Sequence, residues 1–156
     1  MKINTKAYGT IDVDERQQIV FPEGLYGFEA FKTYVLLDAE QQPYYYLQSV
    51  ETQGAAFILL KPFLFRPDYE IDVEDAELAG IGISDPGKAL VFSIVTVPDD
   101  GSPMTANLAG PLVINRERRI GRQIVLTDPR WKTKHDILKE LSENTADEGF
   151  SKGGTA

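Results

Sequence analysis

The stretch that decides the fold is VFSIVTVPDDGSPMTANLAGPLVIN, residues Val91 to Asn115. Its first seven residues, Val91 to Val97, are apolar or β-branched apart from Ser93, which is typical of a strand buried on both faces. The cluster DDGSP at 99–103 favours a chain reversal, and extended chain returns after it. Because Pro111 lacks an amide hydrogen, we expect a break or a sheet edge at Gly110. The stretch predicts a central hairpin whose buried residues are Val91, Phe92, Ile94, Val95, Leu112 and Ile114.

Many further short strands separated by turn signals predict a mostly β protein, as a single-domain antiparallel β-barrel-like or sandwich fold. The expected strands lie at 2–8, 11–13, 18–21, 34–37, 44–50, 56–60, 62–65 and 120–126. Gly121 is expected to mark a bulge or a close approach within the last of these. A short helix near 72–80 would be capped by Asp72 and ended by Gly80. A helical segment is expected from Trp131, and the prediction divides the chain into a β domain at 1–141 and a flexible polar tail at 142–156.

Composition excludes several classes of function. The chain has no cysteine, which excludes disulfides, thiolate zinc sites and cysteine catalysis. It has no apolar signal core after Met1 and no run near the ~20 apolar residues of a membrane span, so we expect a cytoplasmic protein that does not engage a membrane. The net charge of −8 argues against general nucleic-acid binding, because phosphates attract basic faces.

No pattern in the sequence meets the requirements of a catalytic or metal site. The spacing Asp68-x-Glu70-x-Asp72 resembles a calcium loop, but Val73 stands where the sharp turn needs glycine and Ala79 where the last Glu belongs. His135 is the only histidine, and its spacing from Trp131 favours a packing or capping role. We therefore predict no enzymatic activity and no cofactor, with chemistry at Asp68, Glu70 or Asp72 as the enzymatic alternative.

Basic residues gather between Arg116 and Lys134, where seven arginines and lysines face two acidic residues. This segment supports an alternative function, a small β-barrel protein that binds nucleic acid. Against it, Arg118 and Arg122 are expected to share strand parity with Ile120 and Ile124, so a continuous basic face is not expected. Several of these cations are expected to pair with the protein's own carboxylates. The tyrosines at 44–46 could stack on bases, but packing is favoured because their neighbours are not basic.

Five segments of the chain match one known pattern in order. They are YGTIDVDERQQIVFPEGLYGFEAFKTYVLL from Tyr8, FLFRPDYEI from Phe63, VTVP from Val95, TANLAGPLVIN from Thr105 and GRQIVL from Gly121. Together these segments resemble the flagellar assembly factor FliW family. In order, they cover most of the chain from Tyr8 to His135.

The resemblance implies a compact, mostly β domain without enzymatic activity. It implies two alternating partners, the translational repressor CsrA and newly made flagellin. From the charge we expect no direct binding of nucleic acid, and we expect a monomeric free form. Flagellin bound to the factor leaves CsrA free to repress flagellin translation, and export of flagellin lets the factor capture CsrA. Family members are thought to act away from the RNA-contacting surface of CsrA.

The family motifs do not mark the contact residues, so we predict them from charge and exposure. Six carboxylates fall within ten residues, beside three aromatic side chains; charge would steer the encounter and aromatic area would supply affinity. The predicted partner-binding residues are Phe63, Phe65, Asp68, Tyr69, Glu70, Asp72, Glu74, Asp75 and Glu77.

Overall fold

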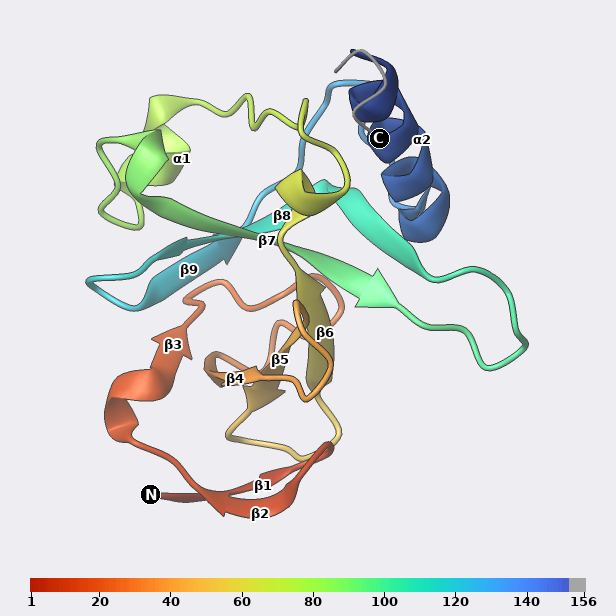
Figure 1. Ribbon diagram of the computed structural model, residues 1–156. Helices are drawn as coiled ribbons and strands as arrows, with labels where there is room; N and C mark the ends of the chain where they lie inside the picture. Colours follow the sequence, from red (N-terminus) through yellow and green to blue (C-terminus); the bar gives the residue numbers. More distant parts are fainter. Residues whose placement is uncertain (152–156) are drawn as a thin grey trace.

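A sheet that closes into a seven-stranded barrel forms the body of the protein (Figure 1). The computed structural model describes residues 1–151, without the side chains of residue 86 and of 145–151. The strand order is β10 (His135–Asp136), β8 (Thr105–Asn115), β7 (Ala89–Thr96), β6 (Ala56–Leu60), β5 (Tyr45–Ser49), β4 (Thr33–Asp38), β3 (Gln18–Val20) and β9 (Ile120–Gln123). The barrel closes because β9 pairs with β3 on one side and with β8 on the other. The β3–β9 pair is parallel and the other pairs in this sheet are antiparallel.

The remaining elements are short, apart from one helix. A separate hairpin is formed by β1 (Lys2–Thr5) and β2 (Gly9–Asp12). Three single 3₁₀ turns are η1 (Glu15–Gln17), η2 (Pro62–Leu64) and η3 (Pro86–Lys88). The α-helices are α1 (Asp75–Ala79) and α2 (Ile137–Ser151), on different sides of the molecule in Figure 1. The predicted fold class is therefore confirmed, as a barrel rather than a sandwich.

The central hairpin is β7 and β8, as predicted, and it changes register along its length. Pairing runs regularly as far as Phe92 with Leu112 and then resumes at Ile94 with Asn107. The β8 residues 108–111, around Gly110, thus bulge away from β7. On its other side β8 pairs with β10 before the bulge and with β9 after it. At Gly110, where we expected a break, strand β8 continues but its neighbouring strand changes from β10 to β9.

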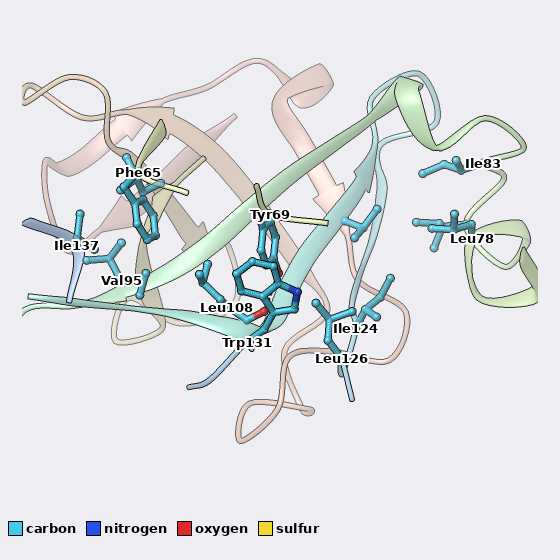
Figure 2. Close-up of a cluster of buried hydrophobic side chains, with 14 residues drawn as sticks. Phe65, Tyr69, Leu78, Ile83, Val95, Leu108, Ile124, Leu126, Trp131 and Ile137 are labelled. Atoms are coloured by element: carbon cyan, nitrogen blue, oxygen red, sulfur yellow. The ribbon is translucent and has the colours of Figure 1, made fainter. Parts of the chain in front are cut away.

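Two apolar clusters cover the two faces of the barrel wall. The inner one contains Ile19, Phe21, Leu25, Tyr34, Leu47, Leu59, Phe92, Leu112 and Ile114. The outer one lies where the long connection between β6 and β7 crosses the wall, and Figure 2 shows its side chains. Phe92 belongs to the inner cluster and Val95 to the outer, so β7 is covered on both faces, as predicted. Val91 and Ile94 are intermediate in exposure, so they are less buried than the other four predicted residues.

Gly121 makes the predicted close approach. A Cβ atom at this position would lie 2.6 Å from Cε2 of Phe21, whose ring is fully buried. Only glycine lets β9 come this near to the residue that follows β3. The barrel closes at this contact between β9 and Phe21.

Three local predictions are wrong. Residues 62–64 form the η2 turn instead of extended chain. Helix α1 begins at Asp75 with Glu74 as its N-cap, so Asp72 caps nothing. The C-terminal helix begins at Ile137 instead of Trp131, because His135 and Asp136 pair as strand β10 with Ala106 and Thr105. The predicted boundary at residue 142 falls inside α2, and residues 152–156 of the predicted tail lie outside the described residues.

Candidate partner-docking surface

The acidic stretch between η2 and α1 has no regular secondary structure, and burial alternates every second residue from Asp68 to Glu74. Tyr69 is buried, and Ile71 and Val73 are half-buried against the outer cluster. The carboxylates between and beside them, at Asp68, Glu70, Asp72 and Glu74, are exposed. We call these four residues the acidic ridge. Because successive side chains of an extended chain point to opposite sides, anchoring the apolar residues presents the carboxylates to solvent.

Two more of the predicted carboxylates continue the ridge into α1. Asp75 is exposed and Glu77 is half-exposed, both in the first turn of the helix. Negative charge at that position is favourable because backbone N–H groups point out of a helix N-terminus. The structure thus brings all six predicted carboxylates into one continuous segment at the surface.

Phe65 and Tyr69 are buried, so the prediction that they contribute contact area is wrong. Their exposed fractions are 1% and 3%. The Tyr69 hydroxyl donates a hydrogen bond to the Leu108 carbonyl at 2.6 Å, and its ring packs edge-on against Trp131 (Figure 2). Burial raises the pKa of the Tyr69 phenol. These aromatic residues anchor the segment instead of meeting a partner.

Exposed apolar area comes from η2 instead. Phe63 was predicted and is 45% exposed; Leu64 was not predicted and is 49% exposed. The 3₁₀ turn puts these neighbours on the outside while Pro62 and Phe65 are buried. Sequence alternation could not find Leu64, because the residues were read as extended chain.

A partly buried ionic network ties α2 to the same segment. Arg66 pairs with Asp68 at 2.8 Å and with Glu140 at 2.7 Å, and both contacts raise its pKa. Glu140 also bonds Nδ1 of His135 at 2.9 Å. Asn144 donates to the Phe65 carbonyl. Nothing in the sequence spacing pointed to this network, because Arg66 and Glu140 are far apart along the chain.

His135 has the packing role that its spacing indicated. It is 7% exposed, and its Nε2 accepts a hydrogen bond from the Lys132 backbone N–H at 2.8 Å. An accepting Nε2 places the proton on Nδ1, which then donates to Glu140. Both ring nitrogens are therefore engaged in holding the segment before α2.

The basic residues at 116–134 lie on three segments, the turn after β8, strand β9 and the loop before β10. Arg116, Arg118 and Arg119 lie in the turn after β8, so the strand parity expected for Arg118 is wrong. Arg122 pairs with Glu23 at 3.0 Å. Arg130 pairs with Asp128 at 2.8 Å and approaches Glu70 at 3.9 Å. The expectation that several of these cations pair with the protein's own carboxylates is confirmed for Arg122 and Arg130.

The three tyrosines at 44–46 pack against three different apolar clusters. Tyr44 lies against the outer cluster, Tyr45 against the inner cluster and Tyr46 against a third beneath the β1–β2 hairpin. All three are half-buried. They do not form one stacking platform.

Among the side chains that the structure describes up to residue 144, no group of three or more His, Asp or Glu is arranged to hold a metal ion. None of the helices described for this chain is both long enough and apolar enough to span a bilayer.

Comparison with known proteins identifies the family. The model of the FliW protein family matches residues 2–137, which is most of the chain. The chain belongs to the FliW family. The flagellar assembly factor FliW of Treponema denticola is 49% identical over 142 residues, which cover 91% of this chain and 97% of that protein. The Treponema pallidum protein of the same name is 47% identical over 148 residues, which cover 95% of this chain and 99% of that protein.

The fold is shared as well. A crystal structure of the flagellar assembly factor FliW matches with a TM-score of 0.80 and 39% identity, covering 88% of this chain and 96% of that one. The barrel, the acidic ridge and α2 described above are thus features of a FliW protein.

Proposed function

We propose that this FliW protein is a non-enzymatic cytoplasmic factor that binds CsrA and so antagonises repression of flagellin translation, and that it binds flagellin in alternation with CsrA. Family membership supports a role in flagellar assembly. The observation that carries the proposal for CsrA is the acidic ridge beside the exposed side chains of Phe63 and Leu64.

The chemistry of the ridge suits a partner that binds RNA. Such a partner carries positive charge, and clustered carboxylates steer a cationic protein toward the ridge even where the docking face lies away from its RNA-contacting surface. Phe63 and Leu64 add apolar area that holds a complex once it has formed. Docking of a protein with net charge −8 also repels RNA that approaches the complex.

The test is binding of purified CsrA and flagellin, each alone and in competition. The wild-type protein should form a complex with each partner, and flagellin should displace CsrA. The triple variant Glu70→Lys, Asp72→Lys, Glu74→Lys should associate with CsrA roughly tenfold more slowly at low salt, with a weaker salt dependence.

A matched control reverses three exposed carboxylates elsewhere, at Glu15, Glu40 and Asp99. It makes the same change in net charge and should associate faster than the ridge variant. If the two triple variants bind CsrA alike, the ridge is not the docking surface. If neither CsrA nor flagellin binds the wild-type protein, the partner switch itself is refuted.

Direct RNA binding is the competing function. We expect weak or no affinity for flagellin-leader RNA in the absence of CsrA, because the arginines at 116–134 are dispersed or paired. Tight, salt-sensitive binding that Arg118→Ala and Arg122→Ala abolish would establish the nucleic-acid alternative instead.

A further inference from the structure

Trp131 holds a buried hydrogen-bond donor that has no partner. The side chain is 4% exposed, and its Nε1 is one of two buried polar side-chain atoms without a partner among the described residues. The other is the Tyr34 hydroxyl in the barrel interior. The neighbouring buried hydroxyl of Tyr69 is satisfied by the Leu108 carbonyl. A buried N–H without an acceptor is unfavourable, so this one needs an explanation.

A surface pocket lies against the same indole. Its volume is about 220 Å³, and it is lined by Asp72, Leu126, Thr127, Asp128 and Trp131. Figure 2 shows the indole nitrogen on the edge of the ring that faces Leu126, one of the lining residues. Two carboxylates thus line a pocket beside the indole whose N–H group is unpaired and closed off from solvent.

The surroundings of the pocket already hold a guanidinium group. The Arg130 guanidinium lies over the Trp131 ring at 4.9 Å from the centroid and pairs with Asp128 at 2.8 Å. A second guanidinium, that of Arg66, lies 4.8 Å from the same centroid but pairs with Asp68 and Glu140 instead. Hydrogen bonds from the side chain and the backbone N–H of Arg130 lower the pKa of the Asp128 carboxyl, so the carboxyl is ionised at neutral pH. A carboxylate beside an aromatic face is a favourable site for an arginine or lysine side chain. Half of the Arg130 side chain is exposed, so another cation can replace it.

We propose that the Trp131 pocket binds a basic peptide segment of a protein partner, and that Arg130 is an internal competitor for it. An arginine or lysine of the segment pairs with Asp72 and displaces the Arg130 guanidinium from Asp128. Displacement of Arg130 from the ring then uncovers Trp131 Nε1, which donates a hydrogen bond to a main-chain carbonyl of the segment. The inference rests on the proposed function because Asp72 belongs to the acidic ridge, and it adds the pocket and the chemistry of its ligand. A phosphate chain does not fit, because both carboxylates repel it.

The single tryptophan makes the test direct, because the ¹⁵N-labelled protein gives one indole N–H signal in NMR. The probe is the peptide acetyl-Gly-Arg-Gly-Arg-Gly-amide, and its counterpart with Glu in place of Arg is the negative control. We expect the arginine peptide to shift the indole signal to saturation and the glutamate peptide to leave it unmoved. An indole signal that does not respond to the arginine peptide overturns the proposal.

Variants then test each part of the site. Asp72→Asn should weaken peptide binding roughly five- to tenfold, since it removes one ion pair at the rim. Arg130→Gln should tighten binding about threefold, because it frees Asp128 from its internal partner.

The controls are Asp14→Asn and Arg16→Gln. The Asp14–Arg16 pair has the same spacing as Asp128–Arg130 and the same hydrogen bonds from the arginine backbone and side chain. Both control variants should bind like the wild type. Equal binding by wild type and Asp72→Asn, or weaker binding by Arg130→Gln, overturns the proposal. CsrA binding without a response at the indole would refute the pocket alone, and an indole response without CsrA binding would refute the proposed function alone.

Discussion

The barrel and the connection that crosses it, residues 61–88, are held in different ways. In the barrel, backbone hydrogen bonds between neighbouring strands fix each residue, and the side chains fill the interior. In the connection, regular elements are limited to η2, α1 and η3, and buried side chains such as Phe65 and Tyr69 hold the backbone in place. The position of the proposed docking surface therefore depends on the buried side chains beneath it.

The largest effect is expected inside the barrel. Phe92 is 1% exposed, so Phe92→Ala should cost about 3–5 kcal/mol of unfolding free energy through lost burial and a residual cavity. Ile94 on the same strand is half-buried, and Ile94→Ala should cost about 2 kcal/mol, at the lower end of the range for such changes. Urea denaturation measures both. A larger loss for Ile94 than for Phe92 would contradict the assignment of the two faces of β7.

Closure of the barrel is the next most sensitive point. Gly121→Ala should cost about 2–3 kcal/mol, because the new methyl group meets the buried Phe21 ring and β9 must move. Gly54→Ala is the control, since a Cβ there meets nothing within 4 Å. Thermal unfolding of the two variants distinguishes a local clash from a general effect of removing glycine. Equal stability of the two variants would show that β9 can move away from Phe21 at little cost in free energy.

A smaller effect is expected in the connection. Tyr69→Phe keeps the ring but leaves the buried Leu108 carbonyl without its donor, at a cost of about 1–2 kcal/mol. The change should also speed hydrogen exchange at residues 66–74 while leaving the barrel strands protected. Loss of protection throughout the barrel would show that the connection and the barrel unfold as one unit.

The smallest expected effect is a loss of stability at acidic pH. Hydrogen bonds from Arg66 lower the pKa of the Asp68 carboxyl below its ordinary value of 3.8. Because the folded pKa is the lower one, this stabilisation is complete above pH 3.8 and is lost as the pH falls through the folded value. Asp68 is half exposed, so the contribution should stay below about 1 kcal/mol.

Asp68→Asn should therefore lose less stability than the wild type between about pH 5 and pH 2. Asp72→Asn, at a ridge carboxylate outside the described ion pairs, is the control. Denaturation midpoints across this pH range provide the measurement. Identical pH profiles for wild type and Asp68→Asn would show that the Arg66–Asp68 pair contributes nothing to stability.

The barrel strands could be predicted from sequence because their signals are local. Neighbouring residues in the sequence are enough to predict strands β6 and β7 and the turn at 99–103. The close approach expected at Gly121 is also observed. The parallel pairing of β3 with β9 left no such signal, since it depends on residues distant in the chain.

The candidate site was only partly predictable. The six carboxylates were placed correctly at the surface, because alternation and charge both favour exposure there. Phe65 and Tyr69 were placed wrongly, because an aromatic residue within an acidic run can serve either as an anchor or as a contact. Which of the two it becomes depends on Trp131 and Leu108, whose contacts with Tyr69 appear only in the folded chain.

Closure of the barrel has to wait until most of the chain has been synthesised. Val20 pairs with Ile120, and the four residues of β9 cover the free edge of β3 and the C-terminal half of β8 together. Until β9 leaves the ribosome, strands β3 to β8 can form at most an open sheet with unpaired edges. Such edges readily pair with other chains. We therefore expect a nascent chain that stalls before residue 120 to aggregate more readily than the folded protein.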